Sequence, residues 1–99
     1  MIRHEFQQST LVVTLDRHPV NAINREWIER FDGILDELAA RPGIAVVLVR
    51  SAQRLFSAGA DLKLMRDCFD SEAGPAEMIE TIRRMQRLYD RIEGLGQVT

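Results

Sequence analysis

The chain opens with two stretches whose residue pattern is typical of strands. Apolar and charged residues alternate from Ile2 to Phe6, and a polar break (Gln7-Gln8-Ser9) separates them from the β-branched run Thr10 to Leu15. Alternation with a period of two indicates a half-buried strand. The pattern predicts an antiparallel hairpin, and Pro19 then ends the second strand because proline cannot donate to a ladder.

From Asn24 the apolar period changes to that of a helix. The apolar stripe consists of Trp27, Ile28, Phe31, Ile34, Leu35 and Leu38. Residues at this spacing lie on one helix face. The predicted helix runs from Asn24, whose side chain suits the N-cap, to Ala40, because Pro42 and Gly43 favour a stop.

The run Ile44 to Val49 is continuously apolar, without alternation. Such a run predicts a strand that is covered on both faces, and strands of this kind are usually parallel. Strand Thr10–Leu15, helix Asn24–Ala40 and strand Ile44–Val49 then form a βαβ unit. The predicted fold class is therefore α/β.

The rest of the chain predicts two helices and the start of a strand. Asp61 suits the N-cap of a short helix through about Cys68, and a second helix is expected from Ala76 to Glu93. Small residues at Ser57-Ala58-Gly59-Ala60 let a ligand approach the unpaired amides of a helix start. Many ordinary helix starts share this composition, so the motif alone is weak evidence for a site. Residues after Leu95 are expected to enter another strand.

Composition narrows the class of protein. Ninety-nine residues allow one domain, and a net charge of −2 with no basic stripe gives no basis for nucleic-acid binding. No apolar run approaches the roughly 20 residues that span a bilayer, and the amino terminus lacks the apolar core of a secretion signal. A lone cysteine, Cys68, fits a reducing compartment. These features predict a soluble cytoplasmic protein that binds no membrane.

Three segments, taken together, identify a family resemblance. They are Leu15-Asp16-Arg17-His18-Pro19-Val20-Asn21-Ala22-Ile23, the run Ile44–Val49, and Leu55-Phe56-Ser57-Ala58-Gly59-Ala60-Asp61-Leu62-Lys63. In order and spacing they resemble the enoyl-CoA hydratase/isomerase (crotonase) superfamily. The resemblance implies the amino-terminal ββα-repeat portion of a crotonase-like spiral fold, with residues 1–99 as an incomplete, truncated segment of that domain.

The resemblance also implies roles for single residues. The backbone N–H of Ala60 matches the position that supplies half of the oxyanion hole for the thioester carbonyl. Contact with coenzyme A falls on Pro19, Val20, Ala58, Asp61, Leu62 and Lys63. Lys63 is expected to meet a phosphate as a point charge.

For function, the resemblance implies an enzyme family of lyases and isomerases that act on acyl-CoA in fatty acid metabolism. Coenzyme A is expected as part of the substrate, with no permanently bound cofactor, and the complete protein is expected to form a homo-oligomer, a trimer or hexamer. The second oxyanion donor and the catalytic glutamates of the family fall beyond Thr99. Two hypotheses stay open: the amino-terminal segment of such an enzyme, or a non-catalytic CoA-binding or subunit-associating module.

Other candidate residues have simpler interpretations. His4 and His18 lack metal-site spacing, so no metal is expected, and Cys68 is expected to be structural. Glu72 and Glu77 flank the presumed acyl pocket, where either carboxylate is a minor candidate for a base. Two sets have a default and an alternative. For Arg83, Arg84, Arg87 and Arg91 the default is a solvated face and the alternative a CoA phosphate or subunit contact. For Met65, Met78 and Met85 the default is core filling and the alternative is that they line an acyl pocket.

Overall fold

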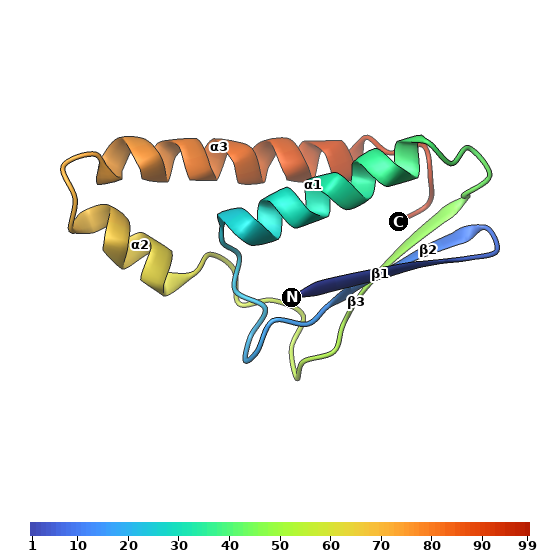
Figure 1. The fold of residues 1–99 in the computed structure, drawn as a ribbon, viewed down its shortest axis with the longest axis horizontal. Coiled ribbons are helices and arrows are strands. Elements are labelled where there is room, and N and C mark those ends of the chain that lie inside the picture. Colours follow the sequence, from blue (N-terminus) through green and yellow to red (C-terminus); the bar gives the residue numbers. More distant parts are fainter.

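The computed structural model describes all 99 residues and contains three strands and three helices. In chain order these are β1 (Ile2–Gln7), β2 (Thr10–Leu15), α1 (Arg25–Ala39), β3 (Val46–Ser51), α2 (Leu62–Phe69) and α3 (Gly74–Glu93). The predicted α/β class is confirmed. Figure 1 shows α1 and α3 running side by side along the sheet, with α2 folded back beneath the start of α3.

The sheet has the order β1-β2-β3. β1 pairs antiparallel with β2, as the hairpin pattern predicts, and the tight turn places Gln8 in the left-handed region with a φ of 55°. β3 pairs parallel with β2, with Leu48 opposite Val12. The central strand β2 is buried on both faces, so it anchors the core.

The prediction that the third strand is covered on both faces is wrong. β3 begins at Val46 rather than Ile44, and Val46 and Leu48 are 36% and 49% exposed. The reason is that the side chains of β3 alternate between two faces, and the helices cover only one of them. Of the predicted return to strand after Leu95, the structure shows one isolated parallel bridge, between Val98 and Val46.

Helix α1 begins and packs as its sequence predicts. The Asn24 side chain accepts a hydrogen bond from the Trp27 amide at 2.9 Å. All six residues of the predicted stripe are buried against the sheet. Trp27 and Phe31 pack together with ring centroids 5.3 Å apart. Burial of such a stripe is the main source of stability for a surface helix.

Helix α3 starts two residues earlier than predicted, at Gly74. A Cβ on Gly74 would lie 1.3 Å from the carbonyl oxygen of Cys68, so the corner between α2 and α3 accepts only glycine. The Cys68 thiol is buried and free, which agrees with a structural role. None of the three helices is long and apolar enough to pass through a bilayer.

The predicted solvated face of α3 is confirmed in part: Arg83 and Arg87 are exposed and Arg84 lies 3.8 Å from Glu80, whereas Arg84 and Arg91 also pair with residues of α1. Arg91 binds Asp32 and Asp36 on α1 at 3.1 and 2.6 Å, and Arg84 reaches Glu29 at 3.4 Å. Their spacing along α3 matches the spacing of these acidic residues on the parallel helix α1. We call this set of contacts between α1 and α3 the arginine seam.

Candidate functional site

The loop after β3 lies against the segment that precedes α1. The Ala58 amide donates to the Val20 carbonyl at 2.9 Å. Ile23 forms a parallel bridge with Ala60: its amide donates to the Gly59 carbonyl and its carbonyl accepts from the Asp61 amide, both at 2.8 Å. Two regions far apart in sequence are thus held in register.

Within this loop the Ala60 amide has no acceptor. The neighbouring amides all do: those of Ala58 and Asp61 bond to the facing segment, and that of Gly59 donates to the Ser57 hydroxyl at 3.1 Å. The Gly59 carbonyl faces Ile23, and a trans peptide directs its N–H opposite to its C=O. The Ala60 N–H therefore points away from Ile23 and is free to bind a ligand.

Asn21 was not singled out as a site residue from the sequence, yet it is fully buried beside this loop. Its side-chain amide donates to the Ser51 hydroxyl and to the Phe56 carbonyl, each at 2.8 Å. Its side-chain oxygen accepts from the Arg17 amide at 2.8 Å. The sequence signal for this position is an asparagine in the turn after Pro19. Asparagine tolerates the left-handed φ of 51° that Asn21 has here.

Asp61, predicted to contact coenzyme A, has structural partners. Its carboxylate accepts from the amides of Lys63 and Leu64 at the start of α2, and forms a 2.7 Å ion pair with Arg17. Burial raises the pKa of the Asp61 carboxyl, but the hydrogen bond from Arg17, those from the two amides and the Arg17 charge outweigh this effect and lower it below its ordinary value. The carboxylate is therefore kept ionised at the N-terminus of α2.

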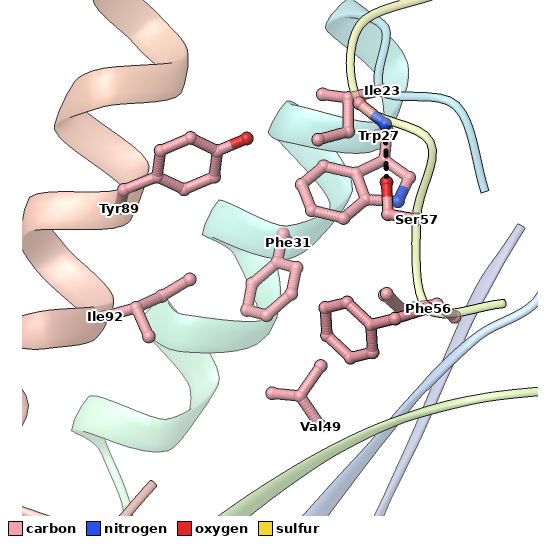
Figure 2. A pocket seen from close by; sticks show the side chains of 10 residues that line it. Ile23, Trp27, Phe31, Val49, Phe56, Ser57, Tyr89 and Ile92 are labelled. Carbon is pink, nitrogen blue, oxygen red and sulfur yellow. Dashed lines mark hydrogen bonds between the residues drawn. The ribbon is translucent and has the colours of Figure 1, made fainter.

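The loop borders an apolar pocket of about 420 Å³ between α1, α3 and the sheet. Ser57 and Gly59 contribute to its wall, and Figure 2 shows the side chains that line it. The other lining residues are Leu15, Ile23, Trp27, Phe31, Val49, Phe56, Tyr89 and Ile92. Four aromatic side chains give this pocket the size and surface that suit a bulky apolar group.

Two features of the pocket concern single residues. The Trp27 indole N–H is buried without an acceptor, and Trp27 and Ser57 both line the pocket (Figure 2). Partial burial raises the pKa of the Tyr89 phenol. Of the three methionines considered, Met85 packs against the hydrophobic core, as the core-filling interpretation predicts, and none lines the pocket.

A second, polar groove contains Asp61 and Lys63. The remaining lining residues are Arg17, Asn24, Arg25, Glu26, Leu64, Asp67, Cys68 and Glu77. Its three basic side chains are matched by four acidic ones, so its charge alone does not select an anion. Glu77 lies 4.0 Å from Arg25 here and not in the apolar pocket.

The remaining predicted residues lie around this loop in different ways. Val20 is half-buried and bonds to Ala58, whereas Pro19, Leu62 and Lys63 are exposed. Glu72 is also exposed and lines neither the apolar pocket nor the polar groove. The structure brings Val20, Ala58 and Ala60 together, while the contacts expected with coenzyme A stay predictions.

The two histidines lie apart. His4 pairs with Glu37 at 2.8 Å, and His18 is exposed. No group of three His, Cys, Asp or Glu side chains in the structure is arranged to hold a metal ion.

Comparisons with known proteins match the sequence of this chain to one family. The family model for enoyl-CoA hydratase/isomerase matches residues 5–94. A probable enoyl-CoA hydratase of Bacillus subtilis is 31% identical over 86 residues, which cover 87% of this chain and 32% of the relative. A (7aS)-7a-methyl-1,5-dioxo-2,3,5,6,7,7a-hexahydro-1H-indene-carboxyl-CoA hydrolase of Rhodococcus jostii is 46% identical over 55 residues, 54% of this chain and 21% of the relative.

Solved structures agree with the sequence matches. An enoyl-CoA hydratase/isomerase from Marinobacter aquaeolei superposes with a TM-score of 0.81 at 25% identity, over 92% of this chain and 36% of that one. The chain spans about a fifth to a third of the length of the curated relatives it matches. The predicted crotonase-like fold is confirmed, and the chain belongs to the enoyl-CoA hydratase/isomerase family, of which it represents the amino-terminal part.

Proposed function

We propose that this chain binds an acyl-CoA thioester and polarises the thioester carbonyl through the backbone N–H of Ala60. One observation carries the proposal: among the four consecutive amides from Ala58 to Asp61, only that of Ala60 lacks an acceptor. A fixed amide without a partner is the group that an oxyanion hole requires. Gly59, the residue before Ala60, lines an apolar pocket that suits an acyl group.

The chemistry follows from the charge that develops on the thioester oxygen. When a nucleophile or base attacks an acyl-CoA, electron density moves onto this oxygen, and a preset N–H stabilises the oxyanion or enolate. One such donor typically contributes about 3–4 kcal/mol to the transition state. For the protein at full family length, we propose hydration or double-bond isomerisation of the acyl chain, in the cytoplasm and in fatty acid metabolism.

Two other functions fit particular observations. Hydrolysis of a carboxyl-CoA compound is one of them, since the 46% identity to the Rhodococcus hydrolase covers over half of this chain. A non-catalytic, subunit-associating module is favoured by the open face of β3, where Val46 and Leu48 are exposed and Val98 already pairs with the edge. For the complete protein the family resemblance supports a homo-oligomer.

The proposal is tested with two ligands that differ only at the carbonyl. Butyryl-CoA has the thioester oxygen, whereas S-butyl-CoA, a thioether, lacks it. Titration calorimetry should show that the chain binds butyryl-CoA about 3- to 10-fold more tightly, which is the contribution of one hydrogen bond. The variant Ala60→Pro should bind both equally, because proline has no N–H.

Ala60→Pro removes no hydrogen bond of the fold, since the Ala60 N–H has no partner in the protein. The control is Ala60→Gly, which keeps the N–H and should keep the preference for the thioester. Equal affinity of the unmodified chain for the two ligands, or an unchanged preference in Ala60→Pro, would refute the proposal.

A further inference from the structure

We propose that Asn21 is a positioning residue that, with the Ser57 hydroxyl, fixes the direction of the Ala60 N–H; this inference rests on the proposed function. Asn21 is 0% exposed, so a ligand does not touch its side chain. Its effect on a ligand must therefore pass through the groups to which it is bonded. These groups belong to three separate segments of the chain.

The side chain of Asn21 joins the segment before α1 to the end of β3 and to the first half of the loop that follows it. Its amide nitrogen donates to the Ser51 hydroxyl, on the last residue of β3, and to the Phe56 carbonyl, at 2.8 Å each. Its oxygen accepts from the Arg17 amide. Both donor hydrogens and the acceptor are used, so the buried amide is satisfied and the path of residues 51–56 is fixed.

A second set of bonds leads from the Asn21 backbone to the candidate donor. The Ser57 hydroxyl donates to the Asn21 carbonyl at 2.9 Å and accepts from the Gly59 amide at 3.1 Å. The Gly59 carbonyl accepts from the Ile23 amide at 2.8 Å. Since this carbonyl and the Ala60 N–H belong to one planar peptide, the bonds that hold Gly59 also set the direction of the donor.

Other side chains at position 21 would lose part of this arrangement. Alanine would leave the Arg17 amide and the Phe56 carbonyl without their partner, and aspartate could accept but not donate. The left-handed φ of 51° also disfavours most residues other than asparagine and glycine. The Asn21 side chain thus combines a backbone requirement with three directed hydrogen bonds.

The experiment compares Asn21→Ala and Ser57→Ala with the unmodified chain, again with butyryl-CoA and S-butyl-CoA as probes. Both variants should reduce the 3- to 10-fold preference for the thioester to less than twofold. Their affinity for S-butyl-CoA should change by less than twofold, because Asn21 is buried and Ser57→Ala removes only one oxygen atom from the wall of the apolar pocket. A residue with a merely structural role would lower both affinities together and leave the ratio unchanged.

The matched control is Asn24→Ala. It removes a different partly buried hydrogen bond, which the Trp27 amide donates to the Asn24 side chain, and it changes no contact of the loop after β3. It should destabilise α1 and keep the ligand preference. If Asn21→Ala does not fold, Ser57→Ala tests the same bonds with a smaller change. An unaltered preference in Ser57→Ala and in any folded Asn21→Ala overturns the inference and leaves the proposed function intact.

Nuclear magnetic resonance spectra of the backbone amides test this inference independently of the proposed function. Without ligand, Ser57→Ala should shift the Gly59 and Ala60 amide resonances and raise the exchange rate of the Gly59 amide about 10-fold, because its acceptor is lost. If the unmodified chain shows no thioester preference, the proposed function fails and the spectra still decide the positioning role. Unchanged Gly59 and Ala60 signals in the variant would then overturn it.

Discussion

The two long helices differ in how much apolar surface and how many ion pairs attach them to the rest of the molecule. Helix α1 buries six apolar side chains against the sheet, whereas α3 is five residues longer and buries one large apolar side chain, Leu88. Ile79, Ile82 and Tyr89 on α3 are exposed. Leu88, the partly buried Met85 and Ile92, and the arginine seam, in which Arg91 binds two aspartates, together join α3 to the rest of the molecule.

This difference predicts how each part responds to change. Each buried apolar side chain contributes about 1.5–3 kcal/mol, and salt scarcely affects it. Exposed ion pairs contribute about 0–1 kcal/mol each and are screened by salt. We therefore expect α1 and the sheet to form the stable unit, and α2 and α3 to be the part whose attachment depends on pH and ionic strength.

The largest effect is expected from Phe31→Ala. Phe31 is 2% exposed, lies in the core cluster and packs against Trp27, so truncation leaves a cavity beneath α1. We expect the free energy of unfolding to fall by about 3–5 kcal/mol. Urea unfolding followed by circular dichroism and by the fluorescence of Trp27, the one tryptophan, measures it.

The matched variant on α3 is Ile82→Ala, which truncates an apolar side chain that is 44% exposed. It should cost less than about 1 kcal/mol, because little surface is removed from the core. Equal losses for Phe31→Ala and Ile82→Ala would show that the two helices are held alike and would end the comparison.

The next effect concerns Asp61, which attaches the start of α2 to Arg17. Asp61→Ala removes an N-cap and an ion pair, and should lower stability by about 1–2 kcal/mol at pH 7. The folded-state pKa of this carboxyl is lowered, so its stabilisation is complete above the unfolded pKa of about 3.9 and is lost as the pH falls through the folded value. Unfolding measured from pH 7 downward should show the two proteins converging below about pH 4.

Asp61→Asn separates the two contributions of this side chain. Asparagine caps helices as well as aspartate does, but it carries no charge to pair with Arg17. Its loss should be smaller than that of Asp61→Ala. A stability gap between the unmodified chain and Asp61→Ala that widens toward low pH would contradict the assigned direction of the pKa.

The same contrast explains what the sequence could predict. Helix α1 and the cap at Asp61 depend on local signals, a 3.6-residue period and a capping side chain, so both were predictable. The oxyanion position Ala60 was found through the family resemblance. Its geometric support, a free amide between bonded neighbours, appears only when residues 20–23 lie against the loop.

Features that depend on distant contacts were not predictable in this way. Asn21 bonds to partners 30 and 35 residues away, and Arg91 to aspartates 55 and 59 residues away. The apolar run of β3 reads the same whether one face or both faces are covered, which is why its open face was missed. The need for Gly74 arises from the close approach of the Cys68 carbonyl at the α2–α3 corner.

The smallest effect is expected from Arg91→Ala. Losing the contacts with Asp32 and Asp36 should weaken the attachment of α3 by about 0.5–1 kcal/mol at 0.1 M salt, because these side chains are partly exposed. In about 1 M NaCl the difference between variant and unmodified chain should fall toward zero. Amide hydrogen exchange of α3, compared with that of α1, measures the loss locally.

Arg83→Ala is the control, since Arg83 lies on the same helix and makes no ion pair or side-chain hydrogen bond in the structure. It should change exchange in α3 by less than the Arg91 variant at either salt concentration. If exchange quickens equally in α1 and α3 of Arg91→Ala, the two helices open as one unit. The arginine seam would then contribute to the whole fold rather than to the attachment of α3 alone.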